Sequence, residues 1–293
     1  MQYFLHFKSS TNATPVKGFR GIKNQCAHWI FIPRSLDGGF AFVRAMLTSK
    51  ATQRFAVATY KLWEERTMNV LIACEESQAV CKAFREKGHQ AFSCDILPCS
   101  GGHPEWHIRG NVLPLLNGRC EFTTMDGETH HIEGKWDMII AHPPCTYFST
   151  AGANWLFRGG KLDEERYKKG LEMRGLFMSI YNADCDRIAI ENPVVMKIWN
   201  LPKHTQEIQP YQFGHPYTKK TRIWLKGLPE LKPTEIVEPV AKWVGCGNKT
   251  NREKQNQAVC KSYTNDRAKT FEGVANGMAE QWGEGCKNGK NSL

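Results

Sequence analysis

Short apolar runs recur along the chain from residue 68 onward, and polar residues end each of them. These runs fall at 69–74, 91–94, 138–141 and 187–190. A short continuous apolar run is typical of a strand that is buried on both faces of a parallel sheet. A weaker run at 108–116 predicts a further short strand, and 209–213 with 221–225 predict a late pair of strands.

Amphipathic segments lie between the runs and after them. Residues 78–87 and 163–182 carry apolar side chains at helical spacing, and so does 266–283 near the end of the chain. Strands that alternate with helices predict an α/β fold of Rossmann-like type. We expect a mixed, mostly parallel sheet with helices on both faces.

The same pattern divides the chain into parts. Residues 1–67 lack the strand–helix rhythm and hold ten Lys/Arg and three Asp/Glu, which is +7 of the net charge of +10. They are predicted to be a basic N-terminal extension with a helix at 40–60. It is either a nucleic-acid-binding arm, or an appendage or sequence translated upstream of a start at Met68, and the latter reading is favoured because the α/β pattern begins directly after it. Three parts follow. The catalytic core is predicted at 68–225, and a short recognition segment or loop insertion at 226–266. A C-terminal helix that returns to the core, with a frayed tail, is predicted at 267–293.

Composition excludes several classes of protein. No apolar run approaches the roughly 18 residues that a membrane span needs, and the first residues lack a signal-peptide pattern. The 11 cysteines are scattered without Cys-x-x-Cys pairs, which predicts reduced thiols in a cytoplasmic setting. Cys99, His103 and His107 have a spacing that suits a metal, but no fourth ligand accompanies them, so no metal site is predicted.

One cysteine lies where α/β proteins bind ligands. The strand predicted at 138–141 stops at Pro143 and Pro144, because neither proline can donate a hydrogen bond to a neighbouring strand. Cys145 follows at the carboxyl end of the strand, the edge at which open α/β sheets bind ligands. A single cysteine is more often a small buried apolar residue than a nucleophile. The position of Cys145 alone therefore leaves both readings open.

Other polar residues follow predicted strands at the same edge. Glu191 ends the strand at 187–190, and Arg222 lies in the late strand. Asp95 ends the second strand, where a carboxylate suits a pair of ribose hydroxyls. A solvated aspartate at a strand end is equally compatible with this position. The turn at 73–77 is not a Gly-x-Gly-x-x-Gly phosphate cradle.

Four motifs occur in a recognisable order along the core. They are Pro-Pro-Cys-Thr-Tyr-Phe-Ser at 143–149, Glu-Asn-Pro at 191–193, Lys-Thr-Arg at 220–222 and Ala-Asn-Gly at 275–277. This set resembles the DNA cytosine-5 methyltransferases, and the strand–helix–strand unit at 71–95 is similar to their cofactor-binding unit. The resemblance covers about 215 of the 293 residues. It implies a class I S-adenosylmethionine-dependent methyltransferase fold.

The chain departs from the family pattern in several places. Its cofactor turn at 73–77 is not glycine-rich, and Asn111 stands where an acidic residue would contact adenine. Lys220 replaces an arginine, and the recognition segment at 226–266 is short. These features resemble the compact relatives of phages and prophages. The resemblance thus implies the cytoplasm of a bacterial or phage-infected cell and a restriction-modification setting.

The resemblance assigns roles to individual residues. Cys145 would add to C6 of cytosine so that C5 takes a methyl group from S-adenosylmethionine. Glu191 would hold the N3 and N4 edge of the base, and Arg222 would lower the pKa of the thiol. The cofactor-binding set is Ala73, Cys74, Glu75, Glu76, Ser77, Asp95, Asn111, Pro143 and Asn276. The substrate-binding set is Pro144, Ser149, Asn192 and Lys220.

The implied partner is double-stranded DNA, from which the target base would be flipped into the site. Lys219, Lys220 and the basic run at 249–254 would contact phosphates. Three alternatives stay open: the same chemistry on a free pyrimidine nucleotide, a non-catalytic nucleic-acid-binding remnant of the fold, and an amino-methyltransferase. The last also carries Pro-Pro at its strand end but follows it with an aromatic residue. No oligomeric state is predicted.

Overall fold

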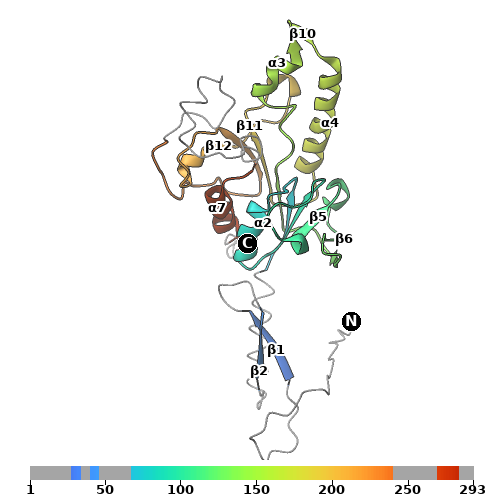
Figure 1. The fold of residues 1–293 in the computed structure, drawn as a ribbon, viewed down its shortest axis with the longest axis vertical. Helices are drawn as coiled ribbons and strands as arrows, with labels where there is room; N and C mark the ends of the chain where they lie inside the picture. The colour runs from blue at the N-terminus through green and yellow to red at the C-terminus, as the bar shows by residue number, and fades with distance from the viewer. Residues whose placement is uncertain (1–27, 34–39, 46–66, 240–268, 284–293) are drawn as a thin grey trace, which may run out of the picture.

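A seven-stranded mixed sheet forms the core of the protein (Figure 1). The computed structural model describes residues 28–33, 40–45, 67–239 and 269–283. In chain order the strands of the sheet are β3 (Asn69–Ala73), β4 (Gln90–Asp95), β5 (His107–Arg109), β8 (Met138–Ala141), β11 (Ile188–Pro193), β12 (Gln206–Ile208) and β13 (Thr221–Lys226). In space their order is β12-β13-β11-β8-β3-β4-β5.

Strand directions confirm the predicted α/β class with a mostly parallel sheet. The strands β11, β8, β3, β4 and β5 pair in parallel, whereas β13 is antiparallel to both β11 and β12. Parallel strands at the centre of such a sheet are covered on both faces. Every residue of β8 is accordingly buried, as are four of the five residues of β3.

The direction in which strands are added reverses next to β3. From β3 the chain runs outward to β4 and β5, and it then returns to the other side of β3 to form β8 and β11. Where the strand order reverses, the loops after the two central strands diverge and leave a crevice that binds ligands. The loops after β3 and β8 therefore border the expected binding edge.

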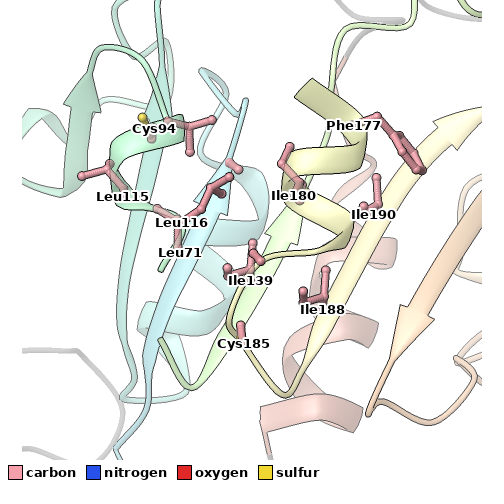
Figure 2. Packing of buried hydrophobic residues seen from close by; sticks show 14 of the residues in the cluster. Leu71, Cys94, Leu115, Leu116, Ile139, Phe177, Ile180, Cys185, Ile188 and Ile190 are labelled. Carbon is pink, nitrogen blue, oxygen red and sulfur yellow. The ribbon is translucent and has the colours of Figure 1, made fainter. Parts of the chain in front are cut away.

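Helices cover both faces of the sheet. On one face α4 (Glu164–Tyr181) directs Phe177 and Ile180 towards the strands that carry Ile139 and Ile190 (Figure 2). The other face is covered by α2 and α7, which lie side by side (Figure 1). These two helices span Ala79–Glu86 and Glu272–Gly283.

Local chemistry places the ends of these helices. Asp163 begins α4, and its side chain accepts a hydrogen bond from the backbone N–H of Arg166. Glu164 and Glu165 add negative charge in the first turn, where the helix dipole favours it. Gly88 follows α2 with a φ of 86°, a left-handed conformation that suits glycine after a helix.

Shorter elements lie outside the main sheet. Three two-stranded hairpins pair β1 with β2, β6 with β7, and β9 with β10. Their strands are His28–Pro33, Phe40–Ala45, Cys120–Thr123, Thr129–Ile132, Phe157–Arg158 and Lys161–Leu162. The short helix α3 spans Ala153–Leu156. Turns of 3-10 helix occur at Pro104–Trp106, Leu113–Leu115, Thr150–Gly152, Lys197–Trp199 and Pro210–Gln212.

Two predicted elements are wrong. The helix predicted at 40–60 is a strand over Phe40–Ala45, and the rest of that range lies outside the described residues. The strand predicted at 209–213 is replaced by a 3-10 turn that starts at Pro210, because a proline cannot donate to a ladder. The edge strand β12 comes just before it.

The division of the chain at 67/68 and 225/226 stays a prediction. Most of the segment predicted to be a recognition insertion lies outside the described residues. Among the helices that the structure describes, each is too short or too polar to cross a lipid bilayer.

The contact between α4 and Trp199 gives a stability test. A Cβ atom at Gly170 would overlap the ring of Trp199, which is 1% exposed, whereas a Cβ at Gly175 in the same helix would meet nothing. We expect Gly170→Ala to lower the free energy of unfolding by about 1–3 kcal/mol. Gly175→Ala, the matched control, should raise it by about 0.5–1 kcal/mol through helix propensity. Urea unfolding measures both, and a Gly170→Ala variant as stable as the wild type would contradict this packing.

Candidate functional site

The residues that carry chemistry gather where β8 and β11 end. These strands pair in parallel with Ala141 opposite Ile190, so His142, the first residue after β8, lies level with Glu191 of β11. The His142 Nδ1 atom lies 3.2 Å from Glu191 Oε2. The two side chains are 9% and 14% exposed. By strand alternation both belong to the face that α2 and α7 cover.

A second bond joins the same strand ends. Asn192 is 1% exposed, and its Nδ2 donates a hydrogen bond to the carbonyl of Pro143 at 2.8 Å. The Oδ1 atom of this amide is buried and has no hydrogen-bond partner among the described residues. A buried amide oxygen without a donor costs about 1–3 kcal/mol. It is thus a natural contact for a donor from a bound molecule.

Cys145 is exposed in a loop that is held at several points. Its carbonyl accepts hydrogen bonds from the backbone N–H groups of Phe148 and Ser149, both at 3.0 Å. The Phe148 side chain is fully buried, and Arg166 of α4 donates from Nη2 to the Thr146 carbonyl at 2.7 Å. An ordered turn therefore presents the Cys145 residue at the predicted sheet edge.

A small pocket opens beside Glu191. Its lining residues are Glu191, Ile208, Pro210, Lys219, Thr221, Thr270, Phe271 and Val274. Burial acts to raise the pKa of Glu191. The hydrogen bond with His142 and the positive charge of Lys219 outweigh burial, so the pKa of this carboxyl lies below its ordinary value. Glu191 is accordingly a carboxylate at neutral pH.

Arg222 lies on the opposite face of the sheet from Glu191. In the antiparallel pair of β11 and β13, Arg222 is opposite Asn192, whereas Ile223 is opposite Glu191. Residues that oppose each other share a face, and successive residues alternate. The predicted grouping of Arg222 with Glu191 is therefore not formed through this pairing.

The basic residues at the start of β13 and in the segment before it contact two different glutamates. Arg222 Nε donates to Glu207 Oε1 at 3.0 Å, and Lys220 Nζ lies 3.2 Å from Glu207 Oε2. Lys219 and Thr221 instead line the pocket of Glu191. The cation that the structure brings to Glu191 is thus Lys219, which lies one residue before the predicted motif.

The turn after β3 is built around Glu75. Its two carboxylate oxygens accept hydrogen bonds from the backbone N–H groups of Val80 and Cys81, at 2.7 and 3.2 Å. Burial raises the pKa of Glu75, and the charge of His142 opposes that rise. Glu75 therefore binds the start of α2, whereas Glu76 beside it is partly exposed. Of the two predicted partners for a ligand ammonium group, Glu76 is the accessible one.

Two other predicted cofactor residues lie at the carboxyl ends of the next strands. Asp95 ends β4, is partly exposed, and accepts a hydrogen bond from the Leu97 N–H at 2.9 Å. Asn111 follows β5, is exposed, and accepts from the Leu113 N–H at 3.1 Å. Ile96, which the sequence reasoning passed over, is 74% exposed directly after Asp95. An acid, an amide and an apolar side chain therefore share this edge.

The remaining predicted residues are spread more widely. Ala73 is buried at the end of β3, and Cys74 follows it with a φ of 60°. Ser77 is partly exposed and Pro144 is exposed. Asn276 is exposed on α7 although its two neighbours are buried, so it faces solvent and not the sheet.

The described residues contain no cluster of three or more side chains suited to a metal ion. The spacing of Cys99, His103 and His107 does not produce one. His107 is fully buried, and its ring nitrogens lie 2.8 Å from Ser93 Oγ and 3.0 Å from the Leu97 carbonyl. The residue is a hydrogen-bonded core histidine.

Sequence reasoning missed His142 and the pocket role of Thr221 and Thr270. The signal for His142 was its place directly after the apolar run of β8, one residue before the prolines. Thr270 Oγ1 lies 3.4 Å from His142 Nδ1 and comes from a distant part of the chain, so no local pattern announced it. Comparison with known proteins finds neither a family model nor a curated protein that matches this chain.

The accessibility of Cys145 can be measured directly. Burial raises the pKa of Cys81 and of Cys94 to about 12, so at pH 8 only about one in 10⁴ of these thiols is a thiolate. We expect iodoacetamide at pH 8 to modify Cys145 at least ~100-fold faster than Cys81 in a pulse-labelling experiment read by peptide mass spectrometry. Cys145→Ser should lose the fast-labelled peptide. Equal labelling rates at Cys145 and Cys81 would refute the exposed position of Cys145.

Proposed function

We propose that the protein transfers a methyl group from S-adenosylmethionine to C5 of cytosine in DNA, through a covalent bond between Cys145 and C6. One observation carries the proposal. The loop that presents Cys145 and the strand end that carries Glu191 are joined at the carboxyl edge, through Asn192 to Pro143 and His142 to Glu191. A thiol and a carboxylate held at one edge suit nucleophilic attack on a base that is gripped by its polar edge.

The proposed reaction assigns one role to each of these groups. The Cys145 thiolate adds to C6, the electron pair of the C5–C6 bond moves into the ring, and N3 gains a proton from the side of Glu191. C5 then becomes nucleophilic and takes the methyl group, and S-adenosylhomocysteine is the leaving group. Loss of the C5 proton to solvent water restores the C5–C6 double bond, breaks the bond between sulfur and C6 and frees Cys145 as a thiolate. The proton at N3 returns to the protein, so the residues end as they began.

The chemistry of the sheet edge fits the nucleoside part of the cofactor. The Asp95 carboxylate suits two ribose hydroxyls, the Asn111 amide suits an adenine ring edge, and the exposed Ile96 offers an apolar surface for the ring. Glu76 suits the ammonium group, since Glu75 is committed to α2. Bound S-adenosylmethionine would supply an electrophilic methyl group. The mixed, mostly parallel sheet is also the one that the resemblance implies.

Exposed apolar residues beyond the Cys145 loop, two of them aromatic, favour DNA over a free nucleotide as substrate. Trp155, Phe157 and Leu162 are 59%, 42% and 39% exposed on α3 and the β9–β10 hairpin, which projects at the top of Figure 1. The Arg158 guanidinium lies 5.6 Å from the centre of the Trp155 ring. Aromatic faces beside cations suit stacked bases and phosphates. A free nucleotide would have no use for this surface.

The covalent step can be trapped with DNA that contains 5-fluorocytosine. Fluorine at C5 cannot leave as a proton, so the bond between Cys145 and C6 should persist after methyl transfer. We expect a complex stable to denaturing gel electrophoresis with wild-type protein and S-adenosylmethionine. Cys145→Ser and a reaction without S-adenosylmethionine serve as controls. An adduct with a free 5-fluorocytosine nucleotide but none with DNA would show that the substrate is the nucleotide. No adduct with either would exclude the covalent mechanism.

The pocket geometry makes Lys219, rather than Arg222, the cation that matters for Glu191. We expect Lys219→Met to lower kcat for methyl transfer by about 10- to 100-fold, since a charge that faces the base pocket is lost. Arg222→Met, on the other face of the sheet, should lower kcat by less than about threefold. Steady-state kinetics on a cytosine-containing duplex compare the two. The reverse order would favour the role predicted for Arg222 from the sequence, in which it lowers the pKa of the Cys145 thiol.

A further inference from the structure

His142 is a buried histidine with one partnered and one unpartnered nitrogen. Its Nδ1 lies 3.2 Å from Glu191 Oε2 and 3.4 Å from Thr270 Oγ1. Its Nε2 is buried and has no hydrogen-bond partner among the described residues. A hydrogen bond between Nδ1 and the carboxylate needs a proton on one of the two facing atoms, because otherwise two lone pairs would face each other.

We infer that His142 and Glu191 hold one proton between them, and that this pair delivers the proton which N3 of the target base receives. The inference deepens the proposed function and rests on it. The same proton count describes a carboxylate beside an imidazolium and a carboxylic acid beside a neutral imidazole. A shift of the proton across 3.2 Å converts one form into the other without a net change in charge. His142 is in this sense a positioning residue, because it acts through Glu191.

The surroundings of the pair favour this assignment. Glu75 faces His142 from the turn after β3, and Lys219 faces Glu191 from the segment before β13. Thr221 and Thr270 supply the neutral polar contacts. Glu191, whose pKa is lowered, is thus the ionised carboxylate that faces His142, whereas burial raises the pKa of Glu75.

The pair also answers a need of the proposed reaction. Glu191 is a carboxylate, because the hydrogen bond with His142 and the charge of Lys219 lower its pKa. A carboxylate alone has no proton to give to N3. In the inferred pair His142 supplies that proton through Glu191 as the thiolate adds to C6, and it takes the proton back when Cys145 leaves.

A titration that needs no catalysis tests the shared proton. The ring signals of His142 are followed by ¹H–¹⁵N NMR against pH, and the loss of signals in His142→Asn assigns them. We expect Glu191→Gln to move the His142 titration to lower pH by about one unit or more, because a neutral amide stabilises the imidazolium less than a carboxylate does. If His142→Asn does not fold, His142→Gln gives the assignment. A midpoint that Glu191→Gln leaves in place would overturn the inference.

The pH dependence of methyl transfer tests the role in the reaction. The side-chain amide of His142→Asn can still donate to Glu191, but it cannot hold the proton. We expect the alkaline limb of its kcat profile to move to lower pH by about 1–2 units, with KM for S-adenosylmethionine changed by less than about threefold. His142→Phe removes the hydrogen bond as well and should be slower than His142→Asn at every pH. A purely structural role predicts an unshifted profile.

The two experiments fail in different ways. Wild-type protein that transfers no methyl group to any cytosine substrate, yet shows the titration coupled to Glu191, would refute the proposed function and the delivery of the proton. It would leave the shared proton standing. Normal methyl transfer with an uncoupled titration and an unshifted His142→Asn profile would refute the inference alone.

Discussion

The parallel pairing of β8 with β11 is the constraint on which the candidate site depends. Because Ala141 lies opposite Ile190, the first residue after β8 falls at the same level of the sheet as Glu191 of β11. That register puts His142 beside Glu191 on one face and brings Asn192 to the Pro143 carbonyl on the other. A shift of one residue would reverse the face of every side chain beyond the shift. The apolar residues of both strands, buried on each side, fix the register.

Burial of charge is the second constraint on this edge. Glu75, His142 and Glu191 come from three different segments and share a region with little access to water. Burial alone would raise the pKa of both carboxyl groups, and it does so for Glu75. For Glu191 the neighbouring His142 and Lys219 reverse the direction. The two buried carboxyl groups of this edge therefore have pKa values that are shifted in opposite directions, because only Glu191 has both a hydrogen bond from His142 and a nearby ammonium group.

The sequence predicted what depends on continuous apolar runs. The strands that carry Cys145, Glu191 and Asp95 were located because a strand buried on both faces leaves an uninterrupted run, and because polar residues and prolines mark its end. The α/β class and the long helix α4 follow from the same periodicities. The carboxyl edge as the place of the site also follows, since parallel strands bring their ends together.

Side-chain direction could not be predicted in the same way. Arg222 and Lys219 are three residues apart, and only the observed register shows that Lys219 shares the pocket of Glu191 while Arg222 meets Glu207. Glu75 looked available to a ligand, but the backbone N–H groups at the start of α2 take both of its oxygens. Thr270 reaches His142 across 128 residues of chain. Each of these contacts is set by tertiary packing, and no local pattern in the sequence indicates it.

The exposed thiol shows how packing and chemistry are combined at this edge. The nucleophile of the proposed reaction must reach its substrate, yet its position has to be fixed for the sulfur to be aligned. Here Cys145 is exposed, while Pro143 before it and Phe148 after it are buried. The buried residues hold the loop on α4 and β11, so the exposed segment between them is short. Exposure of Cys145 and attachment of the backbone to the core are thus supplied by different residues of one loop.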